Sequence, residues 1–221
     1  MQGRFIVFEG VEGCGKTTQL GHLQLWLQQQ LQQQGSDIQV IATREPGGTD
    51  LGQEIRQLLL HPSSEEVMQD RTELLLYAAD RAQHVAHFLK PHLAQGNWVL
   101  CDRYTDSTIA YQGYGRKLDR ALIDQLNAIA TEGLQSDLTL WLDVEVEMGL
   151  SRAQKRGQHD RMEQASLAFH QRVQQGFTEL AQTYPDRIVR VDGRGSEAEV
   201  AQQIQEILKN RFIEWGIAPK S

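Results

Sequence analysis

The segment EGVEGCGKTT, residues 9–18, has the residue types and the spacing of a phosphate-binding loop. Residues 10–17 fit the pattern G-x-x-x-x-G-K-[ST] and lie between an apolar run and a segment of helical character. In such a loop the glycines let backbone N–H groups converge on phosphates, and the helix N-terminus adds the positive end of its dipole. Lys16 would reach the terminal phosphates and Thr17 would ligate Mg²⁺. A glycine-rich turn that only caps a helix is the weaker alternative.

A second group of polar residues begins in CDRYTDSTIAYQGYGR, residues 101–116. Asp102 could hold Mg²⁺ or its water shell, and the guanidinium of Arg103 could bind a phosphate. Tyr77 and Arg81 lie one helical turn apart, as stacking on a flat base and reading its edge would need. Structural alternatives stay open: a surface ion pair with a helix cap for Asp102 and Arg103, and a core tyrosine on an exposed helix for Tyr77.

Five short apolar segments predict the scaffold that would position these residues. Residues 4–9, 38–43, 97–102, 138–143 and 187–192 have the pattern of buried strands, and the stretches between them are long enough for helices. Strands that alternate with helical crossovers form a mostly parallel sheet covered on both faces, which is the α/β class. Ligands bind beyond the carboxyl ends of such strands, where Glu9, Asp102 and Asp143 would lie.

One predicted crossover helix has an unusual composition, TTQLGHLQLWLQQQLQQQGSD. Four leucines, at positions 20, 23, 27 and 31, fall on one helical stripe and Gly35 supplies a stop. This pattern favours a helix with a solvated glutamine face over a disordered glutamine-rich tract. Residues 197–212 predict a last helix, and residues 213–221 a frayed tail. We expect one domain over residues 1–221.

The composition narrows the class of protein. Of the 221 residues 40% are hydrophobic, and no run of about 18 apolar residues predicts a membrane span. The N-terminal segment lacks the features of a secretory signal, so we expect a cytoplasmic protein. The formal charge of −7 gives no overall attraction to nucleic acid, so phosphate ligands must meet local clusters of Arg, Lys and amides.

The cysteines and histidines give little sign of chemistry of their own. Cys14 and Cys101 lie far apart without a CxxC pattern, which argues against a zinc site or a disulfide. We interpret Cys14 as a small space-filling residue, with a low-pKa, redox-sensitive thiol as the alternative. His84 and His87 are assigned to a helix surface.

Five motifs in this order, EGVEGCGKTT, TREPGGT, LLLYAADRAQH, DRYTDSTIAYQGYGR and GLSRAQKRGQHDRME, resemble the bacterial thymidylate kinases from about residue 4 to about residue 192. The resemblance implies the P-loop NTPase fold, a three-layer α/β structure with a five-stranded parallel sheet, and a homodimer. It also implies transfer of the ATP γ-phosphoryl group to dTMP, with ATP as co-substrate and Mg²⁺ as cofactor. No nucleic acid or membrane partner is expected.

The resemblance also assigns individual residues. Those matching the ATP-binding positions are Gly10, Val11, Glu12, Gly13, Cys14, Gly15, Lys16, Thr17 and Thr18, and those matching the metal positions are Thr17 and Asp102. The catalytic positions are matched by Lys16, Arg103, Arg156 and Glu9. The dTMP contacts are Tyr77 on the thymine ring, Arg81 on its O4 edge, Arg103 and Arg56 on the phosphate, Ser107, Thr108 and Tyr111 around the base and deoxyribose, and Glu12 near the 3′-hydroxyl. Tyr77 stands where phenylalanine is common, so its hydroxyl needs a partner or water.

Residues 149–163 match the mobile lid of the family. The basic positions of the lid are matched by Arg152, Arg156 and Arg161. Gln154 stands where some relatives have another arginine. We therefore expect Arg156 to contact the transferring phosphoryl group, with Lys155 as the second candidate. A solvated helix face is the alternative for Arg152 and Arg156.

A phosphate monoester is mostly dianionic at pH 7, so this transfer needs alignment and charge neutralisation rather than a general base. Two rival functions stay open: a kinase for another acceptor, and a non-catalytic nucleotide-binding module. A switch GTPase is disfavoured, because the segment RKLD has Arg116 where the base-reading motif N-K-x-D requires asparagine.

Overall fold

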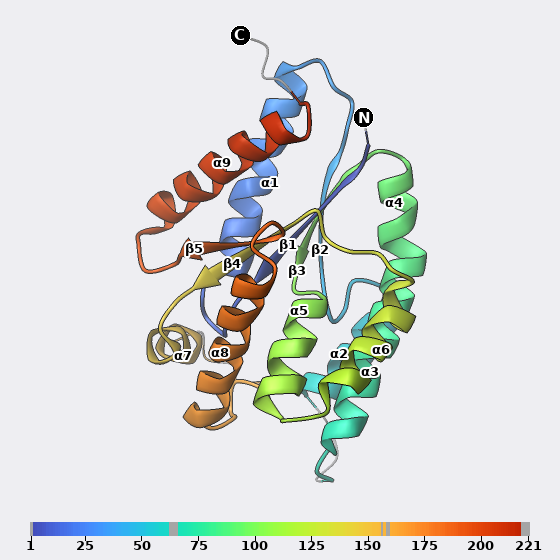
Figure 1. Cartoon of the computed structure of the whole chain (residues 1–221), viewed down its shortest axis with the longest axis vertical. Coiled ribbons are helices and arrows are strands. Elements are labelled where there is room, and N and C mark those ends of the chain that lie inside the picture. The colour runs from blue at the N-terminus through green and yellow to red at the C-terminus, as the bar shows by residue number, and fades with distance from the viewer. Residues whose placement is uncertain (1, 62–65, 156, 158–159, 218–221) are drawn as a thin grey trace.

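The protein is built around a parallel five-stranded sheet with the order β2-β3-β1-β4-β5 (Figure 1). The structure, a computed structural model, describes residues 2–61, 66–155, 157 and 160–217. Its strands are β1 (Arg4–Glu9), β2 (Val40–Arg44), β3 (Trp98–Asp102), β4 (Leu138–Asp143) and β5 (Ile188–Asp192). The five predicted strands are confirmed: β1 and β4 have the predicted bounds, and the other three begin one or two residues later.

Strand β1 occupies the middle of the sheet. It pairs with β3 on one side and with β4 on the other, and its residues 5–9 are all buried. A strand covered on both faces carries a continuous apolar run rather than an alternating one, as FIVF does. In the register of these pairs Phe8 lies beside Asp102, and Glu9 beside Trp141. The polar residues that end β1 and β3 therefore lie at the same edge of the sheet.

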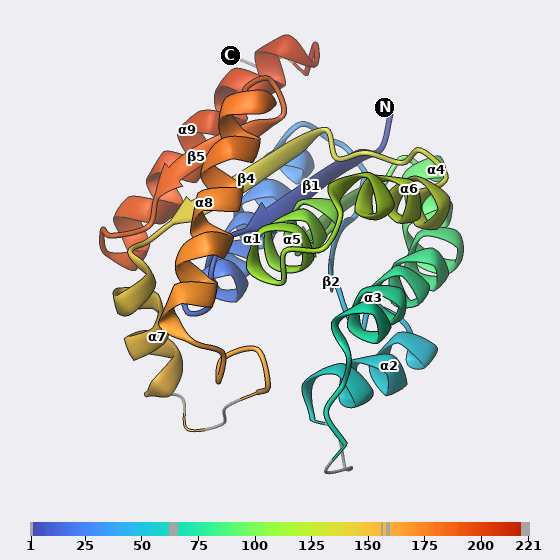
Figure 2. The ribbon, with the colours of Figure 1, turned by 60° about the horizontal axis from the view of Figure 1, so that its bottom comes forward.

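Helices cover both faces of the sheet and give the fold three layers. They are α1 (Lys16–Gln33), α2 (Asp50–Leu60), α3 (Asp70–His84), α4 (Lys90–Ala94), α5 (Thr105–Thr108), α6 (Arg120–Thr131), α7 (Val146–Gln154), α8 (Leu167–Thr183) and α9 (Glu197–Glu214), with the π-helical segments η1 (Val85–Leu89) and η2 (Ile109–Gly115). Helices α1 and α9 lie on one face, α5, η2 and α8 on the other, and α2, α3 and α6 lie side by side (Figures 1 and 2). In the described part of the chain, no helix combines the length and the apolar character needed to cross a membrane.

Helix α1 confirms the predicted leucine stripe. Its four leucines at positions 20, 23, 27 and 31 are buried, and Gly35 has a φ of +70° just after the helix. Its glutamine face is less solvated than predicted, because two side chains bind the backbone beside the edge strand β2. Gln24 donates to the carbonyl of Val40, and Gln28 exchanges hydrogen bonds with Ile38 and Val40. These amides occupy backbone groups that a sheet edge would otherwise leave open to another chain.

The prediction of a frayed tail from residue 213 is wrong for its described part. Helix α9 continues to Glu214, and the N–H of Ile217 donates to the carbonyl of Phe212 at 2.8 Å. The ring of Trp215 packs edge-on against Trp98, with centroids 5.7 Å apart, and lies under the guanidinium of Arg4. Packing of a large, partly buried aromatic side chain orders this segment, and position near a chain end does not predict such packing.

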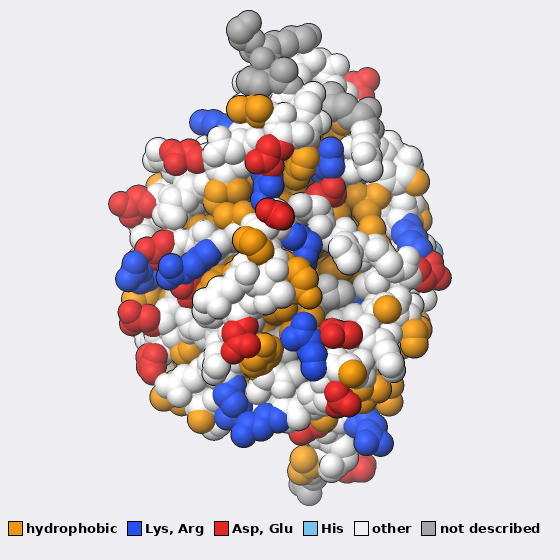
Figure 3. All heavy atoms as spheres, in the orientation of Figure 1, with side chains coloured by type: hydrophobic (Ala, Val, Ile, Leu, Met, Phe, Trp, Pro, Cys, Tyr) orange, Lys and Arg blue, Asp and Glu red, His pale blue; other side chains and the backbone are white. Residues whose placement is uncertain are grey.

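Charged side chains of both signs are interspersed on the surface. Figure 3 shows Lys and Arg beside Asp and Glu over much of the face that it displays. Such a mixture agrees with the formal charge of −7, and the face displayed carries no broad basic patch that would attract a polyanion. Binding of phosphate groups therefore depends on how a few basic residues are arranged locally.

Candidate active site

A cleft of about 840 Å³ opens at the carboxyl edge of the sheet. It lies between the phosphate loop, the loop after β2, helix α3 and the segment that follows β3. Most predicted site residues line it, namely Glu12, Gly13, Cys14, Gly15, Lys16, Thr17, Thr18, Arg56, Tyr77, Arg81, Asp102, Arg103, Ser107, Thr108 and Tyr111. Glu9, Gly10 and Val11 lie outside this lining, and Arg156 lies outside the described residues.

The phosphate loop wraps around the ammonium group of Lys16. Its Nζ donates to the carbonyl oxygens of Gly10 at 3.1 Å and Val11 at 3.0 Å. Gly13 has a φ of +69°, and a Cβ there would lie 2.0 Å from the carbonyl oxygen of Gly149, so only glycine fits. Helix α1 begins at Lys16 without a side-chain cap, which leaves the N–H groups of its first turn available to an anion.

Thr17 and Asp102 bring two oxygen donors together beside this loop. The hydroxyl of Thr17 donates to Oδ2 of Asp102 at 3.0 Å. Among the described residues, no three His, Cys, Asp or Glu side chains gather to hold a metal ion by themselves. Mg²⁺ takes oxygen ligands and commonly keeps one or two protein groups alongside phosphate oxygens and water. The Thr17 and Asp102 pair therefore fits Mg²⁺ in chemistry and in number.

Arg103 joins the phosphate loop to the segment after β3. Its Nη1 donates to the carbonyl of Gly10 at 3.0 Å and to Oγ of Ser107 at 3.1 Å. Its Nη2 donates to Glu12 at 2.7 Å and to the hydroxyl of Tyr111 at 3.0 Å. The residue has a φ of +72°, in the left-handed region that non-glycine residues rarely adopt, and such strain persists where the surroundings hold it in place.

The charge of Glu12 is fixed by these same neighbours. Burial opposes its ionisation, but Arg103 and Lys16 outweigh that effect and lower the pKa of Glu12 to about 2. Its Oε1 also accepts a hydrogen bond from the hydroxyl of Tyr111 at 2.9 Å. Glu12 is thus an anion at neutral pH, held beside the guanidinium that would meet an incoming phosphate.

Glu9 lies behind the wall of the cleft. One carboxylate oxygen accepts hydrogen bonds from the backbone N–H groups of Tyr104 and Ser107, and the other accepts one from the Ser107 hydroxyl at 2.5 Å. Burial, with a smaller contribution from Asp106, raises the pKa of Glu9 to about 7. The predicted catalytic carboxylate therefore contacts the start of α5 and borders the cleft through Tyr104 and Ser107, which line it.

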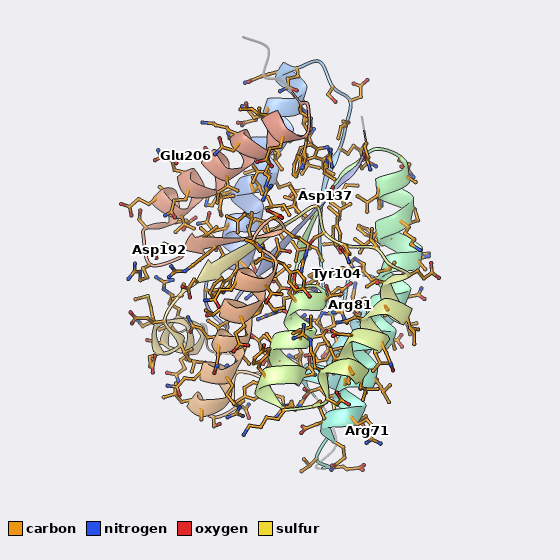
Figure 4. All side chains as sticks on the ribbon, in the orientation of Figure 1. Arg71, Arg81, Tyr104, Asp137, Asp192 and Glu206 are labelled. Carbon is orange, nitrogen blue, oxygen red and sulfur yellow. The ribbon has the colours of Figure 1, made fainter. Side chains whose placement is uncertain are left out.

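At the other end of the cleft, Tyr77 and Arg81 line the same pocket, as their spacing predicts. The guanidinium of Arg81 lies beside Tyr104 and donates to its carbonyl at 3.0 Å (Figure 4). It also binds Glu45, Thr108 and Asn127, each at 2.8 Å. Since a guanidinium has five N–H groups, four are occupied within the described residues, and one remains on Nη2 for a ligand.

His84 corrects the prediction of a surface histidine. Its ring is fully buried, with Nδ1 2.8 Å from Glu45 and Nε2 2.8 Å from the hydroxyl of Thr43. His87 is exposed, as predicted. The sequence missed the burial of His84 because its partners lie about 40 residues earlier. Together Glu45 and His84 fix the loop after β2, and Arg44, the last residue of β2, lines the cleft.

Two arginines, Arg44 and Arg56, line the cleft near each other. Arg56, on α2, donates from Nη1 to the carbonyl of Pro46 at 2.9 Å and lines the cleft. Burial, followed by the nearby Arg44, lowers the pKa of Arg56. Two neighbouring guanidinium groups favour an anion with two negative charges.

Cys14 is buried in the phosphate loop, and burial raises the pKa of its thiol. A reactive cysteine needs a lowered pKa and access to solvent. The space-filling interpretation of Cys14 therefore agrees with its surroundings, and the alternative of a redox-sensitive, low-pKa thiol is wrong.

The cleft extends past the phosphate loop to a wall that the sequence analysis did not identify. This wall consists of Arg152, Gly193, Gly195, Glu197 and Val200. Arg152, from α7, donates to the carbonyl of Gly193 at 3.4 Å. The available signal was DGRGSE after a predicted strand, with two glycines and a Ser196–Glu199 capping box at the start of α9.

The basic residues of the predicted lid lie in different places. Lys155 is exposed at the end of α7, whereas Arg152 lines the cleft. Arg161 is turned toward α3, where its Nη2 lies 2.5 Å from Glu73. Asp160, Met162 and Glu163, around Arg161 in the chain, line the cleft.

This fold and this cleft define an enzyme of the P-loop kinase class. A phosphate-binding loop shares one cleft with a pocket that holds an aromatic ring and a guanidinium. Residues 8–204 match the thymidylate kinase family. The chain belongs to that family.

Relatives and a solved structure agree with this assignment. The thymidylate kinase of Trichormus variabilis is 60% identical over 97% of this chain and 100% of its own length. That of a Nostoc species is 59% identical over the same shares of both chains. The crystal structure of thymidylate kinase from Ehrlichia chaffeensis superposes with a TM-score of 0.75 at 33% identity, covering 94% of this chain and 100% of that one.

Proposed function

We propose that this cleft transfers the γ-phosphoryl group of ATP to dTMP, giving dTDP and ADP, within one kinase domain over residues 1–221. Membership in the family makes the protein a dTMP kinase with ATP as co-substrate. The observation that carries the assignment of residues is the position of Arg103. It contacts Gly10 and Glu12 of the phosphate loop together with Ser107 and Tyr111 of the acceptor wall, so it lies where the two phosphates must meet.

The chemistry assigned to these residues is alignment and neutralisation of charge. The dTMP phosphate is already mostly dianionic at neutral pH, so it can attack without a general base. Lys16 and the N–H groups at the start of α1 bind the ATP phosphates, while Arg103 binds the acceptor phosphate, with Arg56 beside it. These cations offset the repulsion between the two polyanions. Because the bound reactants are already aligned, the transfer step no longer includes the entropy cost of bringing them together.

Recognition of the acceptor rests on the walls of its pocket. Tyr77 stacks on the thymine ring, and the remaining N–H of Arg81 donates to a carbonyl oxygen at the ring edge. Thr108 lies 2.8 Å from the same guanidinium and shares this edge. Tyr111, fixed by Glu12 and Arg103, crowds the position where a ribose would carry its 2′-hydroxyl, while Glu12 faces the 3′-hydroxyl.

Mg²⁺ is the cofactor that this donor set fits. Thr17 and Asp102 would hold it beside the terminal phosphates of ATP. When bound there, the ion supplies positive charge to the β- and γ-phosphates. These residues keep the two oxygen ligands in place through their mutual hydrogen bond.

The nucleoside of ATP is assigned to the wall between α7 and α9. The acceptor pocket occupies the Tyr77 end of the cleft, and the phosphate loop lies in the middle. The remaining space is bounded by Arg152, Gly193 and Glu197. A flat guanidinium at Arg152 suits the face of a purine.

A homodimer is inferred from an exposed apolar face on three adjacent helices. Its members are Leu51, Leu58, Leu75, Ala79, Ala82, Leu122 and Ile129, from α2, α3 and α6. Spacings of seven residues on each helix place them on one side. A monomer rarely exposes so continuous a face, whereas a two-fold interface buries one. Leu75→Glu should give a monomer in sedimentation analysis, whereas the wild type should sediment as a dimer.

We place the enzyme in the cytoplasm. Its two cysteines are unpaired and buried, as is common where thiols stay reduced. Its two substrates are nucleotides of the same compartment. No nucleic acid partner is assigned, because the basic groups of the cleft are matched to two small phosphate ligands.

The decisive test is ADP formation from ATP and Mg²⁺ with dTMP, dUMP, dCMP, UMP and thymidine as separate acceptors. The proposal expects dTMP to exceed the other acceptors in kcat/KM by orders of magnitude. A comparable rate with dUMP or thymidine would favour a kinase of broader acceptor range. Nucleotide binding without turnover by any acceptor would favour a binding module instead.

A further inference from the structure

A buried carboxylate outside the cleft connects several of its walls. Glu73 lies on α3 with no exposed surface, one helical turn before Tyr77. Its Oε1 accepts hydrogen bonds from Gln112 at 2.8 Å and from Nε of Arg116 at 3.2 Å. Its Oε2 accepts one from Nη2 of Arg116 at 3.0 Å and lies 2.5 Å from Nη2 of Arg161. One side chain thus holds two guanidinium groups and an amide.

Arg161 connects Glu73 to one wall of the cleft. Its Nε donates to the carbonyl of Leu59 at 2.9 Å, and its backbone N–H donates to that of Leu60 at 3.2 Å, so the residue is tied to the end of α2 as well. Its chain neighbours Asp160 and Met162 face the cleft. The position of these neighbours is therefore set by how firmly Arg161 is held.

Gln112 and Arg116 connect Glu73 to the opposite wall of the cleft. Gln112 itself lines the cleft. The guanidinium of Arg116 lies 4.8 Å from the ring centroid of Phe169, and that ring packs edge-on against Tyr111 with centroids 6.1 Å apart. Glu73 is thus linked to the tyrosine that borders the sugar position by three successive contacts, through Arg116 and Phe169.

The electrostatics of this cluster make the carboxylate hard to replace. Burial opposes ionisation of Glu73, but hydrogen bonds from Arg116 and Gln112 outweigh it and hold its pKa below the usual range. Asp70 lies 3.4 Å from Nε of Arg116 and balances part of the second positive charge. Without the negative charge of Glu73, the guanidinium groups of Arg116 and Arg161 would repel each other across a buried space.

We propose that Glu73 is a positioning residue for the phosphoryl acceptor: by binding Gln112, Arg116 and Arg161 at once, it fixes the two walls between which the nucleoside part of the acceptor lies. This inference rests on the proposed function, because it concerns the acceptor end of the same cleft. It adds a residue that touches neither substrate. The hydrogen bonds and ion pairs of Glu73 within the described residues do not include the phosphate loop or Lys16, so ATP binding should be independent of it.

The test compares Glu73→Gln with wild type in steady-state kinetics, varying dTMP and ATP separately. Glutamine keeps the size of the side chain and loses its charge. We expect KM for dTMP to rise about tenfold or more, while KM for ATP changes less than twofold. The matched control is Asp137→Asn, which removes a carboxylate paired with Arg4 at 2.8 Å near the opposite end of the strands and should leave both KM values unchanged.

A second variant separates positioning from general loss of stability. Arg161→Gln should raise KM for dTMP by a similar factor. The double variant Glu73→Gln with Arg161→Gln should raise KM for dTMP no more than the single variant with the larger increase. Arg161 is partly exposed, so this variant carries the test if Glu73→Gln does not fold. A dTMP KM within twofold of wild type in a folded variant, or strictly additive effects, would overturn the proposal. Wild type that fails to phosphorylate dTMP would instead refute the proposed function.

Discussion

Arg103 reaches from the end of β3 to the phosphate loop and forms a 2.7 Å ion pair with Glu12. This pair joins residues 91 positions apart in the chain and holds a guanidinium between the phosphate loop and the proposed acceptor pocket. An incoming phosphate dianion therefore meets a cation whose position is already fixed, rather than a mobile surface arginine. Such preorganisation is what makes a charge effective in catalysis.

Arg103→Ala should lower kcat about 100- to 1000-fold, the usual loss when one preorganised charge on the reacting groups is removed. ATP binding should change less than threefold, because Lys16 and the start of α1 are untouched. Steady-state kinetics and calorimetric titration of ATP measure the two quantities. Arg120→Ala, an exposed arginine paired with Asp124, is the control and should behave as wild type. Retained turnover at saturating dTMP would remove Arg103 from its assigned role.

Thr17→Val should raise the Mg²⁺ concentration for half-maximal activity about tenfold, since it removes one of two protein oxygens at the metal position. Thr17→Ser keeps the hydroxyl that donates to Asp102 and should remain near wild type. Activity measured over a series of Mg²⁺ concentrations at fixed ATP gives the comparison. Identical Mg²⁺ dependence of activity in the valine and serine variants would show that Thr17 does not bind the ion.

Tyr77→Phe should keep KM for dTMP within about threefold, because none of the described residues hydrogen-bonds to the Tyr77 hydroxyl. Tyr77→Ala removes the stacking surface, and stacking of a base on an aromatic ring contributes about 1–3 kcal/mol, so KM should rise roughly 10- to 100-fold. Kinetics with dTMP as the varied substrate measure both. Equal losses in the two variants would indicate that the hydroxyl, and not the ring, makes the contact.

The sequence predicted what depends on local pattern. Apolar runs predicted the five strands, the spacing of Lys16 and Thr17 predicted the phosphate loop, and the stripe of leucines predicted α1. Each signal lies within about 20 consecutive residues. The placement of Glu9, Asp102 and Asp143 at the ends of strands followed from the general geometry of parallel sheets.

What the sequence did not predict depends on contacts between distant segments. Glu73 gave no signal, because it reads as an ordinary acidic residue in the first turn of a helix, and its partners lie 39 or more positions away. The burial of His84 depends in the same way on Glu45. The packing of Trp215 depends likewise on distant residues, Trp98 and Arg4. In each case the side chain is polar or near a chain end, and tertiary contacts override the local expectation.

The buried carboxylate of Glu9 should make stability depend on pH in a defined window. Its pKa is about 7 in the folded protein, whereas a glutamate in an unfolded chain has the ordinary pKa of 4.5, so the folded state binds more protons between these values. Stability of the wild type should therefore fall as pH rises from about 5 to 8. Titration of Glu12 does not contribute in this pH range, because its pKa of about 2 affects stability only at lower pH.

Glu9→Gln removes the titrating group while keeping an acceptor for the N–H groups of Tyr104 and Ser107. From pH 5 to pH 8 the free energy of unfolding of the variant should gain roughly 2 to 3 kcal/mol relative to wild type, the range expected over this window for that pKa difference. Asp80, whose pKa is raised to about 6 mainly by burial, contributes equally to both proteins and cancels. Urea unfolding at the two pH values measures the difference. A constant difference between variant and wild type would mean that Glu9 stays ionised throughout, as a carboxylate exposed to the cleft would.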